Sequence, residues 1–357
     1  MKILVLPGDG IGPEITEATL SVLNAVNLTH ELGLQFEFAD IGFASLAKTG
    51  TTLPGEVLAR ARDCDGILLG PISHLDYPPR DKGGVNVSAA FRVKLDLYAN
   101  VRPARTRPGI GRMGSKGAAM DLVIMRECTE GFYPDRNMHA GSGEFMPTPD
   151  IAMSLRKITR HACDRIARRA FELARRRQKQ NRVTAVHKAN NFILTDGLFL
   201  EVTRAVAREY PDIELEEIIV DAMAALLVRD PARFDVVLAT NFYADILSDL
   251  ASELSGSLGL AGSINAGETR CAAQAQHGSA PDIAGRDIAN PTSMILSAAM
   301  LLEWLGEHRG LSAGATVARA INEAVDETLA DPAARTRDLG GPLGTRAFTQ
   351  KLLARLG

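Results

Sequence analysis

Long apolar runs and clustered cysteines are both absent from this 357-residue sequence. The longest apolar stretch, MILSAAMLL, is about half the length of a membrane span, and the apolar run at the N-terminus is too short for a signal-peptide core. The four cysteines are far apart and form no Cys-x-x-Cys pair, so we expect neither a zinc site nor a disulfide framework. Reduced thiols in a cytoplasmic protein are the simplest interpretation.

An excess of positive charge is missing too. The formal net charge is −3, with 23% charged and 46% hydrophobic residues. A nucleic-acid-binding protein would show a basic domain or stripe, so this class is not favoured. The one basic cluster, residues 174–182, closes an amphipathic helical pattern, and a solvated helix end stabilised by the helix dipole explains it.

Strand-like and helix-like segments alternate along the chain. Short apolar runs such as KILVL, GILLG and DVVLATN are separated by helical periods such as ITEATLSVLNAV. The alternation predicts an α/β fold with a mostly parallel sheet. Residues 105–119 predict a Gly-rich, basic loop, whereas residues 141–154 fit either a loop or a β-hairpin. The length predicts two domains, and because no long linker is present, we expect the second as an excursion within the first.

The segment PGDGIGPE, residues 7–14, follows an apolar strand and is a near match to a dinucleotide-binding turn. Gly8 and Gly10 fit the Gly-x-Gly-x-x-Gly fingerprint, but Gly12 comes one residue early and Pro13 occupies the sixth position. Proline suits the first turn of a helix. The segment therefore predicts a strand, a Gly-rich turn and a helix from about residue 14, with only a weak match to a standard Rossmann turn.

Two aspartates lie four residues apart in NFYADILSDLASEL. Asp245 and Asp249 would share one face of a helix, and two carboxylates one turn apart suit Mg²⁺ or Mn²⁺. The alternative is a solvated acidic face, although the apolar Phe242 and Ile246 favour a cleft. Asp221, between an apolar run and an apolar helix, is a third candidate, because a charge there needs a partner.

Three arginines occupy positions suited to anion binding. Arg92 and Arg102 lie in FRVKLDLYANVRP, and Arg126 ends an apolar strand. The planar guanidinium group binds carboxylates in a bidentate manner, so three such groups beside a metal would suit a di- or tricarboxylate. Taken singly, each arginine is more often a surface charge.

Three further side chains are candidates for proton transfer or cofactor selection. Lys188 follows the apolar strand VTAV and is expected at the carboxyl end of a sheet strand, where partial desolvation would lower its pKa and make it a base. Tyr133, in EGFY, is a candidate proton donor, and ordinary partial burial is the alternative for both. Asp282 lies in the loop 277–293 before a helix, where its carboxylate could bind two ribose hydroxyls and repel a 2′-phosphate.

Six motifs occur in the order GDGIGPE, RxxLDLYANVRP, RExTEGFY, HKAN…TDG, NxxxDILSDL and HGSAPDIAGxxIANP. In this order they resemble the isocitrate/3-isopropylmalate dehydrogenase family of β-decarboxylating dehydrogenases, over nearly the whole chain. The resemblance implies a two-domain α/β fold with a mostly parallel sheet that is not a standard Rossmann fold. Residues 1–98 and 257–357 would form a discontinuous cofactor-binding domain, and residues 99–256 a central domain with the dimer interface.

The resemblance also assigns roles to residues in active sites shared between the two subunits of a homodimer. The implied substrate-binding residues are Arg92, Arg102, Arg126 and Asn190, the first three of which bind the substrate's carboxylates. The implied catalytic residues are Tyr133, together with Lys188 and Asp221 from the partner subunit. The implied ligands of Mg²⁺ or Mn²⁺ are Asp221, Asp245 and Asp249. The implied cofactor contacts are Ile11, His277, Gly278, Ser279, Ala280, Asp282, Ile283 and Asn290.

The resemblance implies NAD as the cofactor. Family members that use NAD have aspartate at the position of Asp282, whereas NADP-using members tend to have a Lys-Tyr pair at Asp282 and Ile283. In the implied reaction the metal acidifies the substrate hydroxyl, Lys188 removes its proton while hydride passes to NAD⁺, and the resulting β-keto acid loses CO₂. Tyr133 then protonates the carbon.

The segment GGVNVSAAF departs from the family pattern. Isopropylmalate enzymes resemble one another in having leucines at the positions of Ser88 and Ala89, whereas isocitrate enzymes often have serine and asparagine at those of Asn86 and Ser88. We therefore assign Asn86 and Ser88 to substrate binding and expect a malate with a polar 3-substituent, such as isocitrate. Arg80 and Lys82 add positive charge nearby. The alternatives are 3-isopropylmalate, tartrate or D-malate as substrate, or a loop that swings away and contributes nothing to specificity.

A second departure lies in AAQAQHG, where the family usually has an aromatic residue and a glutamate at Ala273 and Gln274. This change predicts weaker packing of the cofactor. A non-catalytic regulatory subunit is a further, less favoured alternative. Such a subunit would be expected to lose Tyr133, Lys188 or the aspartates, and none of them is lost.

Overall fold

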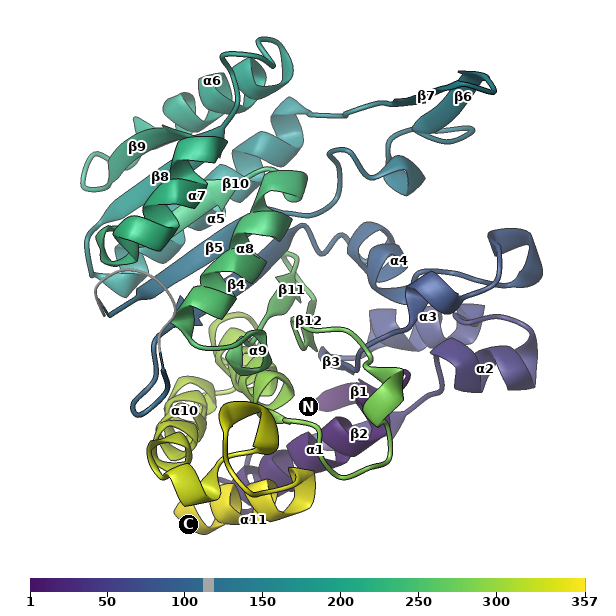
Figure 1. Ribbon diagram of the computed structural model, residues 1–357, viewed down its shortest axis with the longest axis vertical. Coiled ribbons are helices and arrows are strands. Elements are labelled where there is room, and N and C mark those ends of the chain that lie inside the picture. Colours follow the sequence, from purple (N-terminus) through teal and green to yellow (C-terminus); the bar gives the residue numbers. More distant parts are fainter. Residues whose placement is uncertain (112–118, 357) are drawn as a thin grey trace. The chain divides into compact units, whose positions relative to one another are not determined.

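The structure, a computed structural model, describes residues 1–111 and 119–356. The chain forms two compact units (Figure 1). Unit 1 combines residues 1–95, 107–111 and 256–357, and unit 2 combines residues 96–106 with the described part of residues 112–255. Residues 112–118 of the loop expected over residues 105–119 lie outside the described residues.

The sheet of unit 1 is built from both ends of the chain. Its strands are β1 (Lys2–Leu6), β2 (Gln35–Phe38), β3 (Gly66–Leu69), β11 (Ile264–Ala266) and β12 (Cys271–Gln274). They lie in the order β2-β1-β3-β12-β11. All neighbouring pairs are parallel except β11 with β12. Strands β1 and β3 are almost wholly apolar and buried, as expected for parallel strands covered on both faces.

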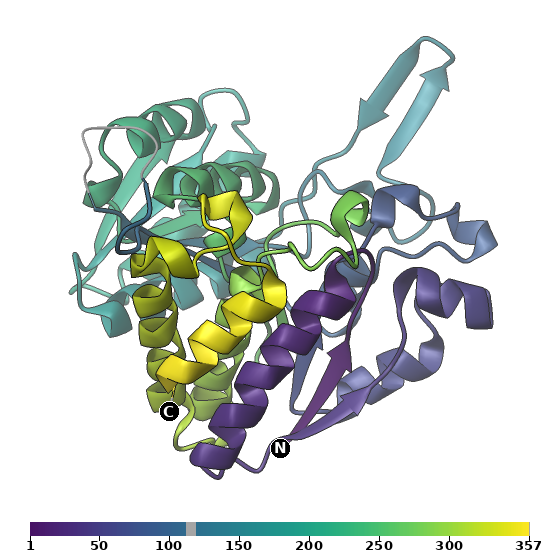
Figure 2. The same ribbon diagram turned by 60° about the horizontal axis from the view of Figure 1, so that its bottom comes forward.

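The helices of unit 1 cover this sheet. They are α1 (Gly12–Thr29), α2 (Gly42–Thr49), α3 (Gly55–Asp63), α4 (Val87–Lys94), α9 (Thr292–Arg309), α10 (Gly314–Ala330) and α11 (Thr345–Leu356). Figure 2 shows α1 beside α11, and α9 packs against both α1 and α10. Helix α9 is buried around most of its circumference, which explains its lack of charged residues in the first three turns.

Unit 2 has a second, mostly parallel set of strands. These are β4 (Ala99–Arg105), β5 (Asp121–Glu127), β8 (Arg182–His187), β9 (Glu214–Ile219) and β10 (Val236–Ala239). They lie in the order β4-β5-β10-β8-β9, and only β4 with β5 is antiparallel. The mostly parallel α/β class predicted from the alternation of elements is therefore confirmed in each unit.

Two cores lie on opposite faces of the strands of unit 2. Helices α5 (Arg160–Arg177) and α6 (Thr195–Ala207) pack on one face, against Val183, Ala185 and Leu238. Helices α7 (Val220–Arg229) and α8 (Asn241–Ser255) pack on the other, against Val186 and Val237. Because successive strand residues point to opposite faces, this alternation assigns each strand residue to one core.

Residues 141–154, which fit either a loop or a hairpin, contain a two-stranded hairpin. Its strands are β6 (Glu144–Thr148) and β7 (Ile151–Ser154), which pair antiparallel with a register irregularity between Phe145 and Thr148. Every residue of both strands is exposed, among them the apolar Phe145, Met146, Ile151 and Met153. No helix in the described part of the chain is long and apolar enough to cross a membrane.

Candidate active site

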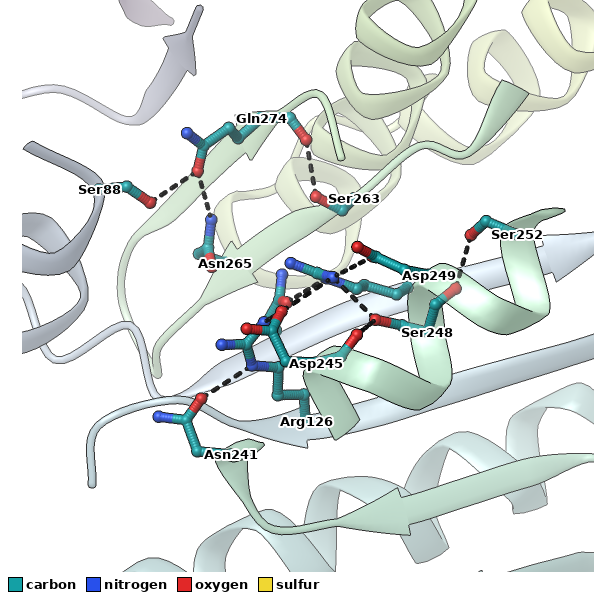
Figure 3. A network of polar contacts seen from close by, with 12 residues as sticks. Ser88, Arg126, Asn241, Asp245, Ser248, Asp249, Ser252, Ser263, Asn265 and Gln274 are labelled. Atoms are coloured by element: carbon teal, nitrogen blue, oxygen red, sulfur yellow. Dashed lines mark hydrogen bonds and ion pairs between the residues drawn. The ribbon is translucent and has the colours of Figure 1, made fainter. Parts of the chain in front are cut away.

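The aspartates of α8 face arginines from two neighbouring strands (Figure 3). Nη1 of Arg102, on β4, lies 3.4 Å from a carboxylate oxygen of Asp245 and 3.2 Å from one of Asp249. The same nitrogen donates to Oγ of Ser248 at 2.7 Å. The i, i+4 spacing therefore brings both carboxylates to one guanidinium group, as the sequence predicts for one face of a helix.

Arg126 lies at the centre of this group. It is 99% buried at the end of β5, and its Nη1 donates to the carboxylate of Asp245. Its Nη2 donates to the hydroxyl of Tyr133 at 3.2 Å, and Tyr133 in turn donates to Asp245 at 2.5 Å. Two positive groups, two carboxylates and a phenol thus lie together in unit 2, which is a suitable setting for an anionic ligand.

Lys188 and Asp221 form a separate pair in unit 2. Nζ of Lys188 donates to Oδ1 of Asp221 at 2.5 Å, and this bond holds the pKa of Asp221 below its ordinary value. Asn190 is exposed and bonds to Asn191. Within one copy of the described residues, no three aspartate, glutamate, histidine or cysteine side chains group as metal ligands. The assignment of Asp221 to a metal site with Asp245 and Asp249 therefore stays a prediction that requires a second subunit.

The donors on α8 are suited to a small divalent cation. Asp245 and Asp249 are carboxylates one helical turn apart, and their side chains are 36% and 54% exposed. Mg²⁺ and Mn²⁺ prefer such hard oxygen ligands and retain waters or substrate oxygens in the remaining positions. Arg102 contacts both carboxylates and Arg126 contacts that of Asp245, so positive charge also comes from the protein at this position.

The Gly-rich turn of unit 1 contacts the backbone of the loop at residues 277–283. The amide of Ile11 donates to the carbonyl oxygen of Ser279 at 2.8 Å. Gly10 has φ +58°, and a Cβ atom there would lie 2.0 Å from the same oxygen. Only glycine allows so close an approach. The turn that follows β1 is thus packed directly against the backbone of the loop at residues 277–283.

Asp9 fixes this turn to the ends of the neighbouring strands. Its buried carboxylate accepts hydrogen bonds from the amides of Phe43 at 2.8 Å and Ser73 at 3.0 Å, and from the hydroxyl of Tyr77. Burial, followed by the bond to Asp9, raises the pKa of Tyr77. Oγ of Ser73 bonds to Oγ of Ser279 at 2.7 Å, which links the segment after β3 to the loop that the Gly-rich turn contacts.

A cavity of about 370 Å³ lies beside this turn within unit 1. Six of the eight predicted cofactor residues line it, namely Ile11, His277, Gly278, Ala280, Ile283 and Asn290. Nδ1 of His277 pairs with the carbonyl oxygen of Gly278 at 2.9 Å, while its buried Nε2 has no hydrogen-bond partner among the described residues. Burial lowers the pKa of His277, so the neutral ring presents an acceptor that a ligand's donor could satisfy.

The other two predicted cofactor residues do not line the cavity. Ser279 is buried behind it through its bond to Ser73, and Asp282 is exposed at the short helical turn Pro281–Ile283. Asn290 lines the cavity but is also a structural residue. Its Oδ1 accepts from the amide of Thr292 at 3.0 Å and its Nδ2 donates to Asp338 at 2.9 Å, so it anchors the start of α9.

The predicted specificity residues are engaged within unit 1. Asn86 is the N-cap of α4, and its Oδ1 accepts from the amide of Ala89 at 3.0 Å. Ser88 donates to Oε1 of Gln274 at 2.9 Å, and Arg92 donates through Nε to Oδ1 of Asn265 at 2.9 Å. The polar side chains of this segment thus also have structural partners, which the sequence pattern did not reveal.

Two supporting residues were missed in the sequence. Asn241 is fully buried, accepts from Nε of Arg126 at 2.9 Å and donates to the carbonyl oxygen of Glu130 at 2.7 Å. Asp196, also fully buried, accepts from the backbone amide of Lys188 at 2.6 Å. Asn241 begins the motif NxxxDILSDL, and Asp196 lies in the TDG part of HKAN…TDG. The motifs therefore include both residues, but the spacing of residues in the sequence could not indicate their hydrogen-bond partners.

The chain belongs to the isocitrate/isopropylmalate dehydrogenase family, whose model matches residues 2–353. Members of this family are decarboxylating dehydrogenases. The chain is 40% identical to a 3-isopropylmalate dehydrogenase of Archaeoglobus fulgidus, with 99% of each chain covered. It is 41% identical to an isocitrate/homoisocitrate dehydrogenase of Thermus thermophilus, covering 99% of this chain and 98% of the relative. The crystal structure of isocitrate dehydrogenase from Methylococcus capsulatus is similar with a TM-score of 0.87 and 40% identity, over 99% of both chains.

Proposed function

We propose that the protein is a metal- and NAD-dependent dehydrogenase that oxidises and decarboxylates a malate with a polar 3-substituent, such as isocitrate. The observation that carries this proposal is the group formed by Arg102, Arg126, Tyr133, Asp245 and Asp249. It combines carboxylate-binding guanidinium groups, two hard metal ligands and a proton donor, which are the groups that this reaction requires.

The proposed role of each of these residues follows from the chemistry of its side chain. A divalent cation on Asp245, Asp249 and Asp221 of the partner subunit would supply Lewis acidity at the substrate's hydroxyl and carboxylate oxygens. Arg92, Arg102 and Arg126 bind the carboxylates and fix the substrate. Lys188 of the partner subunit removes the hydroxyl proton, and Tyr133 returns a proton to the carbon after CO₂ has left.

The proposal of NAD as the hydride acceptor relies on Asp282. This carboxylate is exposed next to the cavity of unit 1, at the end of the loop that carries His277 and Ala280. A carboxylate at such a position accepts hydrogen bonds from ribose hydroxyls and repels a 2′-phosphate. NAD is therefore favoured over NADP.

We also propose that the protein acts as a homodimer with shared active sites. Apolar side chains of unit 2 are exposed on the hairpin and again at Phe192, Ile193 and Leu194, which follow Lys188 in the chain. Ile193 and Leu194 are 73% and 85% exposed. An isolated two-stranded hairpin is marginally stable in water, and apolar surface of this kind favours a partner. A cytoplasmic location stays a prediction.

The second candidate function is 3-isopropylmalate dehydrogenase. The 3-isopropylmalate dehydrogenase of Archaeoglobus fulgidus is 40% identical to this chain, and the isocitrate/homoisocitrate dehydrogenase of Thermus thermophilus is 41% identical. Sequence identity therefore does not distinguish between the two substrates. The predicted polar character of the pocket near Ser88 favours the first candidate.

The test is reduction of NAD⁺ and NADP⁺ by the purified protein with a panel of malates, each with Mg²⁺, Mn²⁺ or a chelator. The panel contains malate, D-malate, tartrate, isocitrate, homoisocitrate, 3-isopropylmalate and a phosphonomethyl analogue. We expect metal-dependent NADH formation with a polar-substituted malate. A highest kcat/KM with 3-isopropylmalate would support the second candidate. Binding of metal and NAD⁺ by folded protein without turnover of any malate would favour a regulatory subunit.

A further inference from the structure

A buried arginine outside the sequence motifs lies between the segments of unit 2 that carry the proposed catalytic groups. The side chain of Arg156 is 5% exposed, and its Nη1 forms an ion pair with Oδ1 of Asp196 at 2.6 Å. Its Nη2 donates to Oγ1 of Thr240 at 3.0 Å. The guanidinium group also lies over the rings of Phe132 and Phe192, at 5.2 and 5.3 Å from their centroids, and the two rings meet edge to face. Arg156 thus contacts three segments that are far apart in the sequence.

The first of these segments holds the backbone of Lys188 at both of its polar groups. The Lys188 amide donates to Oδ2 of Asp196 at 2.6 Å, and the carbonyl oxygen accepts from the amides of Asn191 and Phe192 at 2.9 Å. Asp196 and Phe192 are both in contact with Arg156. Because the backbone of a lysine determines where its flexible side chain begins, these contacts fix the region that Nζ of Lys188 can reach.

The second segment carries Tyr133. The backbones of Gly131 and Lys157 exchange two hydrogen bonds, at 3.0 and 3.1 Å. Lys157 follows Arg156 in the chain, and Phe132 lies between Gly131 and Tyr133. The backbone pairing and the contact between the guanidinium group and the Phe132 ring therefore hold the residue next to Tyr133 in place.

The third segment is the start of α8. Thr240 accepts from Arg156, and the next residue, Asn241, accepts from Nε of Arg126 at 2.9 Å (Figure 3). Arg126 in turn donates to the hydroxyl of Tyr133 at 3.2 Å. Arg156 therefore supports Tyr133 from the helix as well as from its own segment.

We propose that Arg156 is a positioning residue that supports both contributions of one subunit to catalysis, namely Tyr133 in the subunit's own active site and Lys188 in that of its partner. The inference rests on the proposed function, in which the two active sites of a homodimer are shared. A planar guanidinium group suits this role, because its two terminal nitrogens contact Asp196 and Thr240 at the same time while its face lies on the rings. A shift of this one side chain would therefore impair a proton-transfer group in each of the two sites.

The variant Arg156→Lys tests the inference without leaving an uncompensated charge. The ammonium group can still pair with Asp196, but it cannot also contact Thr240 and both rings. We expect a folded homodimer whose kcat, with isocitrate or the malate preferred in the panel, falls by roughly tenfold. The KM of NAD⁺ should stay unchanged, since the predicted cofactor cavity lies in unit 1. The matched control is Arg160→Lys, whose exposed pair with Glu201 should not affect kcat.

Heterodimers with one competent active site separate the two roles. A Lys188→Ala subunit paired with a Tyr133→Phe subunit has one site in which both groups are intact, and it should be active at that site alone. Arg156→Lys is then added to one subunit at a time. In the Lys188→Ala subunit it can act only through Tyr133, and in the Tyr133→Phe subunit only through Lys188. We expect activity to fall by roughly threefold or more in both arrangements.

A fall in only one arrangement, or in neither, would overturn the inference, because Arg156 would then support at most one of the two groups. An Arg156→Lys homodimer that does not fold, or that has a raised KM for NAD⁺, would also overturn it, since Arg156 would then support the whole protein. If the wild-type protein oxidises no malate of the panel, the proposed function itself is refuted. If the wild type is active but the heterodimer of Lys188→Ala with Tyr133→Phe is not, only the sharing of active sites is refuted, and the inference with it.

Discussion

Substitution of Asp196 by asparagine tests the buried ion pair between Asp196 and Arg156. The Asp196 carboxylate is 0% exposed, and its Oδ2 accepts from the Lys188 amide and from the Tyr243 hydroxyl at 3.2 Å. Its Oδ1 forms an ion pair with Nη1 of Arg156 at 2.6 Å. Asparagine keeps one acceptor oxygen for Lys188. The side-chain NH₂ group of asparagine, however, is a donor and would face the buried guanidinium group of Arg156.

The expected loss follows from the burial of this pair. Removing one partner of a buried ion pair costs about 3–5 kcal/mol, since the other charge is left without compensation. Arg156 also lies over the rings of Phe132, Phe192 and Tyr243, at 5.2, 5.3 and 5.0 Å from their centroids. These contacts remain and each stabilises the cation by about 0.5–1 kcal/mol. We therefore expect a loss near the lower limit, about 3 kcal/mol.

Urea-induced unfolding measures the loss. The control is Glu201→Gln, which breaks the exposed Arg160–Glu201 pair between α5 and α6. Both side chains of that pair are 63% exposed, so its loss should stay below about 1 kcal/mol. Adding Arg156→Met to Asp196→Asn should recover more than about 1 kcal/mol, because the orphaned charge is removed. If the unfolding free energy of the Asp196→Asn variant were within about 1 kcal/mol of the wild-type value, the reasoning would be refuted.

Four further outcomes are expected. Asp282→Lys combined with Ile283→Tyr should raise the ratio of kcat/KM for NADP⁺ to that for NAD⁺ by roughly tenfold or more, and an unchanged ratio would contradict the proposed role of Asp282. Asn241→Ala removes the acceptor of Nε of Arg126 and should raise the substrate KM by roughly tenfold while leaving the KM of NAD⁺ unchanged in steady-state kinetics. Burial, with the nearby Glu127 charge, raises the pKa of Glu130 from 4.5 to about 7, so the folded state binds the extra proton and unfolding free energy falls as pH rises from 4.5 to about 7. Glu130→Gln should abolish that fall, measured by urea unfolding across this range. Ile151→Glu in the exposed hairpin should shift sedimentation from dimer to monomer, and an intact dimer would remove the hairpin from the interface.

The fold class could be predicted because burial leaves a periodic signal in the sequence. Apolar strands such as β1, β3 and β10 are buried on both faces and read as continuous apolar runs. Strands β4, β11 and β12 are not apparent in the sequence, because ANVRPAR carries arginines and a proline and the other two have only three or four residues. Strand β9 ends at Ile219 and α7 begins at the next residue, which agrees with the expected position of Asp221 between an apolar run and an apolar helix.

The grouping of side chains on α8 could be predicted from spacing, but not their partners. Asp245 and Asp249 share a face, as expected, and both contact Arg102. The apolar Phe242 and Ile246 were expected to close a cleft around them. They are instead 42% and 56% exposed in the single chain. Helical periodicity identifies which residues share a face, whereas the element that covers this face is determined by distant parts of the chain or by a second subunit.

The order of strands in unit 1 has a consequence for synthesis on the ribosome. Strand β3 is completely buried and lies between β1 and β12, so its second neighbour is made only after all of unit 2. Until residues 271–274 emerge, β3 presents an unpaired apolar edge, which is a template for association with other chains. We expect unit 2 to complete its fold first, while the N-terminal segment remains dependent on chaperones for the time needed to add about 200 residues, from Leu69 to Cys271, or roughly 10–40 s.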